Sequence, residues 1–163
     1  HCHPEEDEAT SPPPTLSSIL ECDDSVSVQA AALTRDQYER VQQWLDPLLS
    51  AGRSCRAARL DGIARTLMAS YRSGWHKHSE FVVSPIVHNS ARFYTAREAA
   101  RIMGFPDGYL IPGHPTRDHG GTAYDEYHRF YHQIGNAVCP PVVKALASSM
   151  MSAMDIGNQK NNM

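Results

Sequence analysis

The fold is determined above all by residues 92–107, which read RFYTAREAARIMGFPD. Thr95 and Glu98 have the spacing of a capping box, in which two side chains satisfy free backbone donors at the start of a helix. Ala99, Ala100 and Ile102 supply an apolar side to the residues that follow, and Gly104 is placed to end the helix. We therefore predict a short helix that begins just after Thr95.

A second informative stretch, residues 131–143, reads YHQIGNAVCPPVV. Pro140 and Pro141 suit a first helical turn, where the N–H groups that proline lacks have no partner anyway. We predict that the last helix begins near Cys139. Its apolar residues recur at helical spacing: Val143, Leu146, Ala147, Met150 and Met154. Residues 105–133 contain prolines, glycines and histidines, and are predicted to be mostly loop.

The first half of the chain carries weaker signals. Thr34 and Gln37 form another capping box and predict a helix over residues 34–49, which Pro47 could end early. Residues 15–20 are predicted to form a single turn. Residues 64–71 and 80–83 are predicted to be extended strands, joined by a basic loop over 72–78.

The segments 92–107 and 131–143 resemble, in this order, motifs IX and X of the cytosine carbon-5 DNA methyltransferase family. Residues 64–71 resemble the Thr-Leu strand at the edge of the target-recognition domain in that family. The resemblance implies an α/β fold. The chain would be the C-terminal portion of a Rossmann-like methyltransferase that uses S-adenosylmethionine, with a small mixed α/β recognition domain.

The resemblance and the composition together divide the chain into four parts. Residues 1–14 are expected to be an acidic, proline-rich linker. Residues 15–91 correspond to the target-recognition domain. Residues 92–156 correspond to the segment of motifs IX and X that packs on the catalytic domain. Residues 157–163 are polar and are expected to form a flexible tail.

The motif X turn is implied to line the methionine end of the S-adenosylmethionine pocket. The residues placed there are Asn136, Ala137 and Val138. Gly135 permits a close backbone approach, and Asn136 offers both a hydrogen-bond donor and an acceptor. A Gly-Asn pair by itself is more often only a capped helix start, so the prediction depends on the surrounding motif.

Two further groups of residues take roles from the resemblance. Thr66, Arg72 and Lys77 are expected to face the nucleic acid, because basic side chains contact phosphates and base edges. Without the family context, a solvated loop is the simpler interpretation. Arg92, Arg97 and Glu98 are expected to support the recognition domain without contacting a base.

The residues that perform the family's chemistry do not occur in this chain. No cysteine follows a proline, and no Glu-Asn-Val segment or glycine-rich cofactor loop is found. We expect no catalytic residue here and no activity from the isolated chain. The expected partners are DNA and a catalytic half, in the same polypeptide or in a separate subunit. The sequence begins with His1, so we expect it to be processed or part of something longer.

Composition sets further limits. The formal net charge of -3 lacks the basic excess of an independent nucleic-acid binder. The four cysteines form no Cys-x-x-Cys pair, which favours a reducing, intracellular compartment: the nucleus in a eukaryote, or the cytoplasm and nucleoid in a bacterium. His76 and His78 lack a third ligand, so we predict no metal site. No uninterrupted apolar run reaches transmembrane length, so we expect no membrane partner.

Three alternative functions remain open from the sequence. The chain could be the small subunit of a split methyltransferase. It could be a non-catalytic module that binds DNA or a methyltransferase. It could also be a fragment of a tRNA cytosine-5 methyltransferase, since a tRNA-methylating branch shares these motifs. In each case the last helix lacks the surface on which it normally packs, and we predict self-association or partial disorder of the isolated chain.

Overall fold

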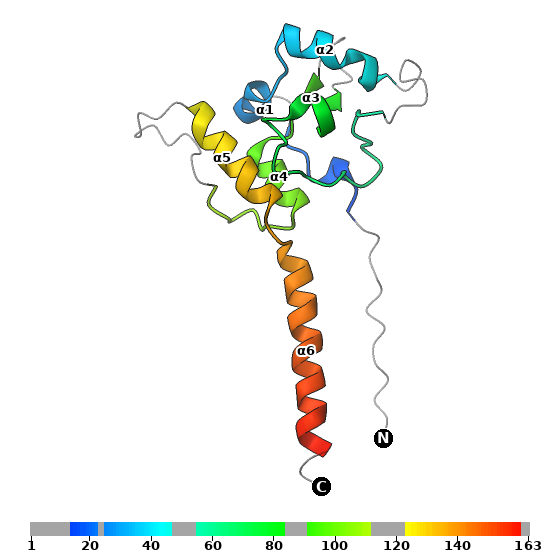
Figure 1. The fold of residues 1–163 in the computed structure, drawn as a ribbon, viewed down its shortest axis with the longest axis vertical. Helices are drawn as coiled ribbons and strands as arrows, with labels where there is room; N and C mark the ends of the chain where they lie inside the picture. The colour runs from blue at the N-terminus through cyan, green and yellow to red at the C-terminus, as the bar shows by residue number, and fades with distance from the viewer. Residues whose placement is uncertain (1–13, 23–24, 47–54, 84–90, 112–122, 161–163) are drawn as a thin grey trace.

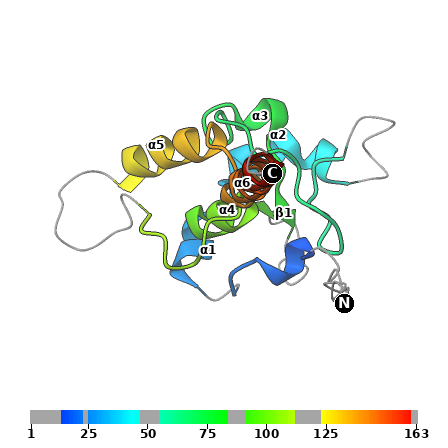
Figure 2. The ribbon, with the colours of Figure 1, turned by 90° about the horizontal axis from the view of Figure 1, so that it is seen from below.

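The computed structural model describes residues 14–22, 25–46, 55–83, 91–111 and 123–160. The described chain is mostly helical and contains one two-stranded sheet, so the expected α/β character is reduced to a small sheet among helices. Helices α1 to α5 gather around this sheet in one body, and α6 projects away from it (Figure 1). Viewed along α6, the helix emerges near the middle of the body (Figure 2).

The N-terminal part of the body contains η1 (Leu16–Ser18), α1 (Val26–Ala30) and α2 (Arg35–Leu45). The single turn predicted for residues 15–20 is confirmed by η1. The capping box of Thr34 and Gln37 is also confirmed. Helix α2 ends at Leu45 because Asp46 is extended, as expected for a residue that precedes a proline.

The middle of the chain differs from the prediction. Residues 63–68 have no regular structure and residues 69–74 form turns, so the strand predicted over 64–71 is wrong. Its backbone donors bond elsewhere: the N–H of Arg65 donates to the Glu80 carboxylate and that of Tyr71 to the Met68 carbonyl. The predicted basic loop contains a one-turn helix, α3 (Trp75–His78).

The sheet is formed by β1 (Val82–Val83) and β2 (Ala91–Arg92), which pair antiparallel. Strand β1 lies inside the extended segment predicted over 80–83. Strand β2 was not predicted, because two residues are too few to produce an alternating pattern. An isolated bridge joins Ala32 to Arg92 and thereby ties the N-terminal segment to the sheet.

The C-terminal part contains α4 (Ala96–Ile102), α5 (Ala123–Gly135) and α6 (Pro140–Lys160). The capping box at Thr95 and the start of the last helix are confirmed. The loop predicted over residues 105–133 is confirmed for 105–111 and wrong from Ala123 onward, where α5 begins, while 112–122 lie outside the described residues. Phe130, Tyr131 and Ile134 bury one face of α5, and this packing outweighs the glycines and prolines that precede it. Helix α6 continues past Gly157, where the tail was predicted to begin.

One hydrophobic core joins the two halves of the described chain. Leu16, Val41 and Phe81 come from the first half, and Tyr94 and Ile134 come from the second half. All five side chains are buried in the same cluster. The first and second halves of the described chain are therefore packed together as one unit.

The carboxylate of Glu98 is the polar centre of this core and is fully buried. It accepts hydrogen bonds from both terminal nitrogens of Arg92, at 2.8 and 3.0 Å. It also accepts the backbone N–H groups of Glu21 and Thr95, each at 2.8 Å. The carboxylate thus ties together three segments: the N-terminal chain, β2 and the start of α4.

A second buried network centres on Glu80. The Tyr94 hydroxyl donates to the Glu80 carboxylate at 2.7 Å, and the Tyr71 hydroxyl donates to the Glu80 carbonyl at 2.8 Å. The Tyr131 hydroxyl closes the network on the Tyr94 carbonyl. Burial raises the pKa of Tyr71 well above its ordinary value. Burial, and then the hydrogen bond to Glu80, raise the pKa of Tyr94 as well.

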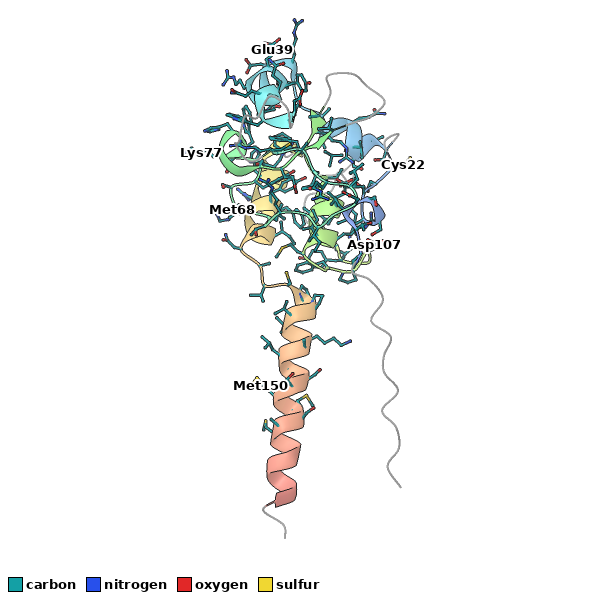
Figure 3. All side chains as sticks on the ribbon, turned by 90° about the vertical axis from the view of Figure 1, so that its right-hand side faces the viewer. Cys22, Glu39, Met68, Lys77, Asp107 and Met150 are labelled. Carbon is teal, nitrogen blue, oxygen red and sulfur yellow. The ribbon has the colours of Figure 1, made fainter. Side chains whose placement is uncertain are left out.

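Helix α6 stands apart from the body (Figures 1 and 3), and its apolar side has no cover in the described part of the chain. Leu146, Met150 and Met154 are 62–68% exposed. The stretch His128–Met154 is long and apolar enough to cross a membrane by length and composition alone, with a mean hydropathy of 1.2. By this measure, the expectation from the sequence that no apolar run reaches transmembrane length is wrong. Residues 136–139, however, interrupt the helix between α5 and α6.

We expect Glu98→Gln to lower the free energy of unfolding by about 3 kcal/mol, because it leaves the buried Arg92 guanidinium without its counter-charge. Urea unfolding followed by circular dichroism measures this loss. The matched control is Glu39→Gln, which breaks an exposed ion pair with Arg35 and should cost at most about 1 kcal/mol. Equal losses in the two variants would contradict a central role for Glu98.

We expect the fold to lose stability in alkali. The raised pKa values of Tyr71 and Tyr94 keep both phenols neutral in the folded chain, whereas the unfolded chain ionises them near pH 10. Stability from these groups is therefore full below pH of about 10 and falls above it, by about 1.4 kcal/mol per pH unit for each tyrosine. Urea titrations at increasing pH measure the slope. Tyr94→Phe should make it shallower, and an unchanged slope would refute this origin.

Candidate cofactor-facing and nucleic-acid site

The glycine of the motif X turn marks the closest approach between two parts of the body. A Cβ atom at Gly135 would lie 2.4 Å from the backbone nitrogen of Ala69 and 2.5 Å from the carbonyl carbon of Met68. Only glycine allows the end of α5 to approach this turn. Gly135 therefore fixes the segment that carries Thr66 and Arg72 against α5.

A second glycine positions the start of α6. Gly104 ends α4 with a φ of 77°, which is the left-handed region that favours glycine. A Cβ atom there would lie 2.7 Å from two ring carbons of Pro141. The turn after α4 and the first turn of α6 are thus in direct contact. The predicted stop at Gly104 is confirmed, together with a packing reason that the sequence did not reveal.

The three residues predicted to face the cofactor lie in the turn between α5 and α6. Asn136 and Val138 are exposed, and Ala137 is half-buried. The Asn136 side-chain nitrogen donates to the His132 carbonyl at 3.1 Å, which leaves the amide oxygen as an acceptor on the surface. The turn thus presents one polar acceptor on the surface. The described chain supplies no opposite wall for a cofactor pocket.

The three residues predicted to face the nucleic acid are close in sequence but differ in their surroundings. Thr66 and Lys77 are exposed, and Arg72 is half-buried in the turn between them. Met68 and Lys77 lie on one side of the body, and Asp107 and Cys22 lie on the other (Figure 3). The side chains around Lys77 therefore belong to a different surface from the loop that follows α4.

Arg72 packs on aromatic rings. Its guanidinium carbon lies 4.4 Å from the ring centre of Phe93 and 5.5 Å from that of Tyr131. Such contacts hold the planar guanidinium in place without neutralising its charge. A pocket of about 370 Å³ opens beside it, between the turn at residues 69–73 and α5. Its lining residues are Ala69, Arg72, Ser73, His128, Arg129, Tyr131, His132 and Gln133.

The residues predicted to support the recognition segment take different places. Arg92 and Glu98 form the buried ion pair described above. Arg97 donates to the Tyr109 carbonyl at 3.0 Å and thereby holds the loop after α4. Arg101, which the sequence analysis overlooked, makes two hydrogen bonds to Asp107, at 2.6 and 3.0 Å. The hydrogen bond from Arg101 lowers the pKa of the Asp107 carboxyl.

Within the residues that the structure describes, no three metal-binding side chains converge. His76 is exposed, as expected of a surface histidine. The pocket residues His128, Arg129 and His132 were overlooked as a site, because the sequence places them more than fifty residues from Arg72. The sequence did offer one signal for this site, because the spacing of the three residues places them together on one helix.

The family model for C-5 cytosine-specific DNA methylases matches residues 16–152. The chain belongs to this family. The description of the family names cytosine-specific methylation of DNA as the activity of its members. The resemblance identified from motifs IX and X is thus confirmed at the level of the family.

Individual relatives match only part of their own length. The type II methyltransferase M.DdeI of Desulfomicrobium norvegicum is 45% identical over 56 residues, which are 34% of this chain and 12% of that protein. The type II methyltransferase M.HgiCI of Herpetosiphon aurantiacus is 26% identical over 146 residues, or 88% of this chain and 30% of that protein. DNA (cytosine-5)-methyltransferase CMT3 of Arabidopsis thaliana is 34% identical over 76 residues, which are 47% of this chain and 7% of that protein.

The fold also matches a solved structure. The S. pombe Dnmt2 methyltransferase superimposes with a TM-score of 0.61 at 16% sequence identity, over 91% of this chain and 45% of that one. At this identity the match concerns the fold alone. This chain therefore folds like part of a methyltransferase and spans less than half of the proteins that it matches.

We expect Gly135→Ala to destabilise the fold by about 3 kcal/mol, because its methyl group would overlap the backbone at Met68 and Ala69. Thermal unfolding measures the effect. Gly108→Ala is the matched control, since a Cβ there meets nothing within 4 Å, and should change stability by less than about 0.5 kcal/mol. A stabilising Gly135→Ala, as helix propensity alone would give, would show that the two segments separate easily.

Proposed function

We propose that this chain is the C-terminal, target-recognising part of a cytosine-5 DNA methyltransferase. In this proposal a catalytic half carries the nucleophile and most of the S-adenosylmethionine pocket, either in the same polypeptide or in a separate subunit. The observation that carries the proposal is α6, a 21-residue helix that begins at the motif X turn and lacks cover in the described chain.

The pattern of α6 favours a protein surface as its partner. Val143, Leu146 and Met150 follow one side of the helix at intervals of three and four residues, whereas Lys144 and Ser148 lie on the other side. Such an exposed apolar stripe is typical of a helix that is buried on docking. This chain covers 30% of M.HgiCI, 12% of M.DdeI and 7% of CMT3, so most of each relative lies outside the matched part.

The motif X turn would take part in cofactor binding once α6 has docked. S-adenosylmethionine supplies the methyl group when it is bound. This chain would orient the methionine end of the cofactor with the turn at Asn136, Ala137 and Val138. The surface amide oxygen of Asn136 suits an ammonium group, because it is an acceptor without a donor of its own.

The nucleic acid would lie along the surface that contains Thr66, Arg72 and Lys77. All three are polar, and two of them carry a positive charge in a chain whose net charge is -3. Sequence reading would occur here, while the flipped base would enter the catalytic half. A tRNA substrate is the second candidate, and the same assay distinguishes it.

The test begins with the protein from its natural source. Its intact mass and the proteins that co-purify with it identify the catalytic half. Transfer of a labelled methyl group from S-adenosylmethionine is then measured on duplex DNA and on tRNA. We expect transfer to DNA only when both halves are present. Transfer by this chain alone, or to tRNA alone, would overturn the proposal.

We expect Leu146→Glu in α6 to reduce methyl transfer at least about tenfold, because it buries an unpaired charge at the docking surface. Ser148→Glu, on the other side of the helix, should leave transfer unchanged. The two variants carry the same charge, so only its position differs. If Leu146→Glu instead leaves transfer intact and abolishes flotation of the protein with lipid vesicles, α6 is a membrane-binding helix and the docking proposal fails.

A further inference from the structure

The pocket beside Arg72 has a concentrated positive charge. Arg72 and Arg129 are permanently cationic, and His128 and His132 contribute two imidazole rings. None of the eight lining residues is acidic. This is notable in a chain with 18 acidic and 15 basic residues. The pocket is therefore suited to an anion.

Arg72 and Arg129 also differ from the other described arginines in their contacts. Each of the others donates to a carboxylate or a backbone carbonyl oxygen, as Arg56 does to His76 and Arg65 to Cys55. In the part of the chain that the structure describes, Arg72 and Arg129 make no such bond. Both guanidinium groups line the same pocket with their donors unused.

The walls of the pocket are held at a fixed separation. One wall is the turn at residues 69–73, and the other is α5. The backbone approach at Gly135 presses the end of α5 against Ala69, and the Arg72 guanidinium lies over the rings of Phe93 and Tyr131. The Arg72 charge and the backbone of α5 are therefore positioned before any ligand arrives, which lowers the entropic cost of binding.

We propose that this pocket binds a single backbone phosphate of the nucleic-acid strand, held jointly by Arg72 and Arg129. The inference rests on the proposed function, and it adds α5 to the surface that contacts the nucleic acid. A phosphate contact there would set the position of the strand without reading its sequence. The other exposed residues of the segment 66–77, such as Thr66 and Lys77, would then contact the bases.

The chemistry of the pocket favours a phosphodiester over a base. The planar guanidinium fork matches phosphate oxygens in a bidentate manner. The Tyr131 ring is buried, with 3% of its surface exposed, and its face is already covered by Arg72, so it offers no platform for stacking a base. The volume of about 370 Å³ is near the lower limit for ligand pockets and suits one nucleotide unit of a strand.

The test measures binding of a fluorescent DNA duplex to this chain together with its catalytic half by anisotropy, as a function of salt. Each phosphate that is neutralised contributes about 0.9 to the slope of log affinity against log salt. We expect Arg72→Gln and Arg129→Gln each to weaken binding, and their combination to lower the slope by about one unit, since they share one phosphate. This corresponds to a loss of about eightfold in affinity at 0.1 M salt.

Arg35→Gln is the matched control. It removes the same charge from a side chain that is 93% exposed on α2 and does not line the pocket. We expect it to leave the slope unchanged. Circular dichroism shows whether Arg72→Gln disturbs the fold, and the exposed Arg129 provides a variant that removes no packing. If the wild-type protein with its catalytic half fails to bind DNA at low salt, or if both pocket variants behave like Arg35→Gln, the inference is wrong.

Other outcomes identify other occupants. A slope lowered by two units in the double variant would assign the arginines to separate phosphates and overturn the shared site. If inorganic phosphate at constant ionic strength binds through Arg72 and Arg129 while the variants keep full DNA affinity, the pocket holds a free anion. If the variants weaken only the association with the catalytic half, it is a protein contact. Each result overturns this inference and leaves the methyl-transfer test of the proposed function untouched.

Discussion

The buried carboxylate of Glu98 is the interaction on which the rest of the structure depends. It satisfies the guanidinium of Arg92 and two backbone N–H groups that come from separate segments. A charged group inside a core is costly unless each of its oxygens is bonded, and here both oxygens accept two donors. The arrangement specifies one register. Any shift of the Glu21 segment or of β2 would leave an ion or a backbone donor without a partner.

Gly104 and Gly135, the glycines of the two family motifs, add two close contacts to the segments that Glu98 ties together. Gly135 brings α5 against the turn at Ala69, and Gly104 brings the end of α4 against Pro141. Both contacts join parts of the chain that lie far apart in sequence. Motif residues that resemble binding residues thus have a mechanical role in this chain: they place the Asn136 turn, the pocket and the base of α6 relative to one another.

The sequence predicted those features that depend on local chemistry. The capping boxes at Thr34 and Thr95 were found because each needs only four consecutive residues. Helix α2 was predicted to continue to residue 49 with a possible early end at Pro47, and it ends at Leu45 because Asp46 is extended before the proline. The partner of Glu98 at Glu21 could not be found, since 77 residues separate the two and a backbone N–H carries no signal in the sequence.

The errors have equally specific causes. Residues 64–71 were predicted to be an extended strand, but a strand also requires a neighbouring backbone, and here Glu80 and a turn carbonyl take the donors. Helix α5 was overlooked because the glycines and prolines that precede it dominate the composition of residues 105–133. Phe130, Tyr131 and Ile134 nevertheless have helical spacing. The same error concealed half of the candidate site. Arg72 was identified on the turn, while Arg129 on α5 was assigned to a loop.

In the proposed function, the nucleic-acid contact and the cofactor-facing turn are connected by one helix, α5. The phosphate pocket and the motif X turn share α5: its side lines the pocket, and its last residue is Gly135. A strand held at Arg129 would thus be coupled through one short helix to the turn at Asn136 and to the first residues of α6. Because α5 is fixed by backbone contact at Ala69, a displacement at the pocket would move the cofactor-facing turn with it. In the proposal, the contact with the strand and the position of the turn at Asn136 would then be linked by rigid packing through α5.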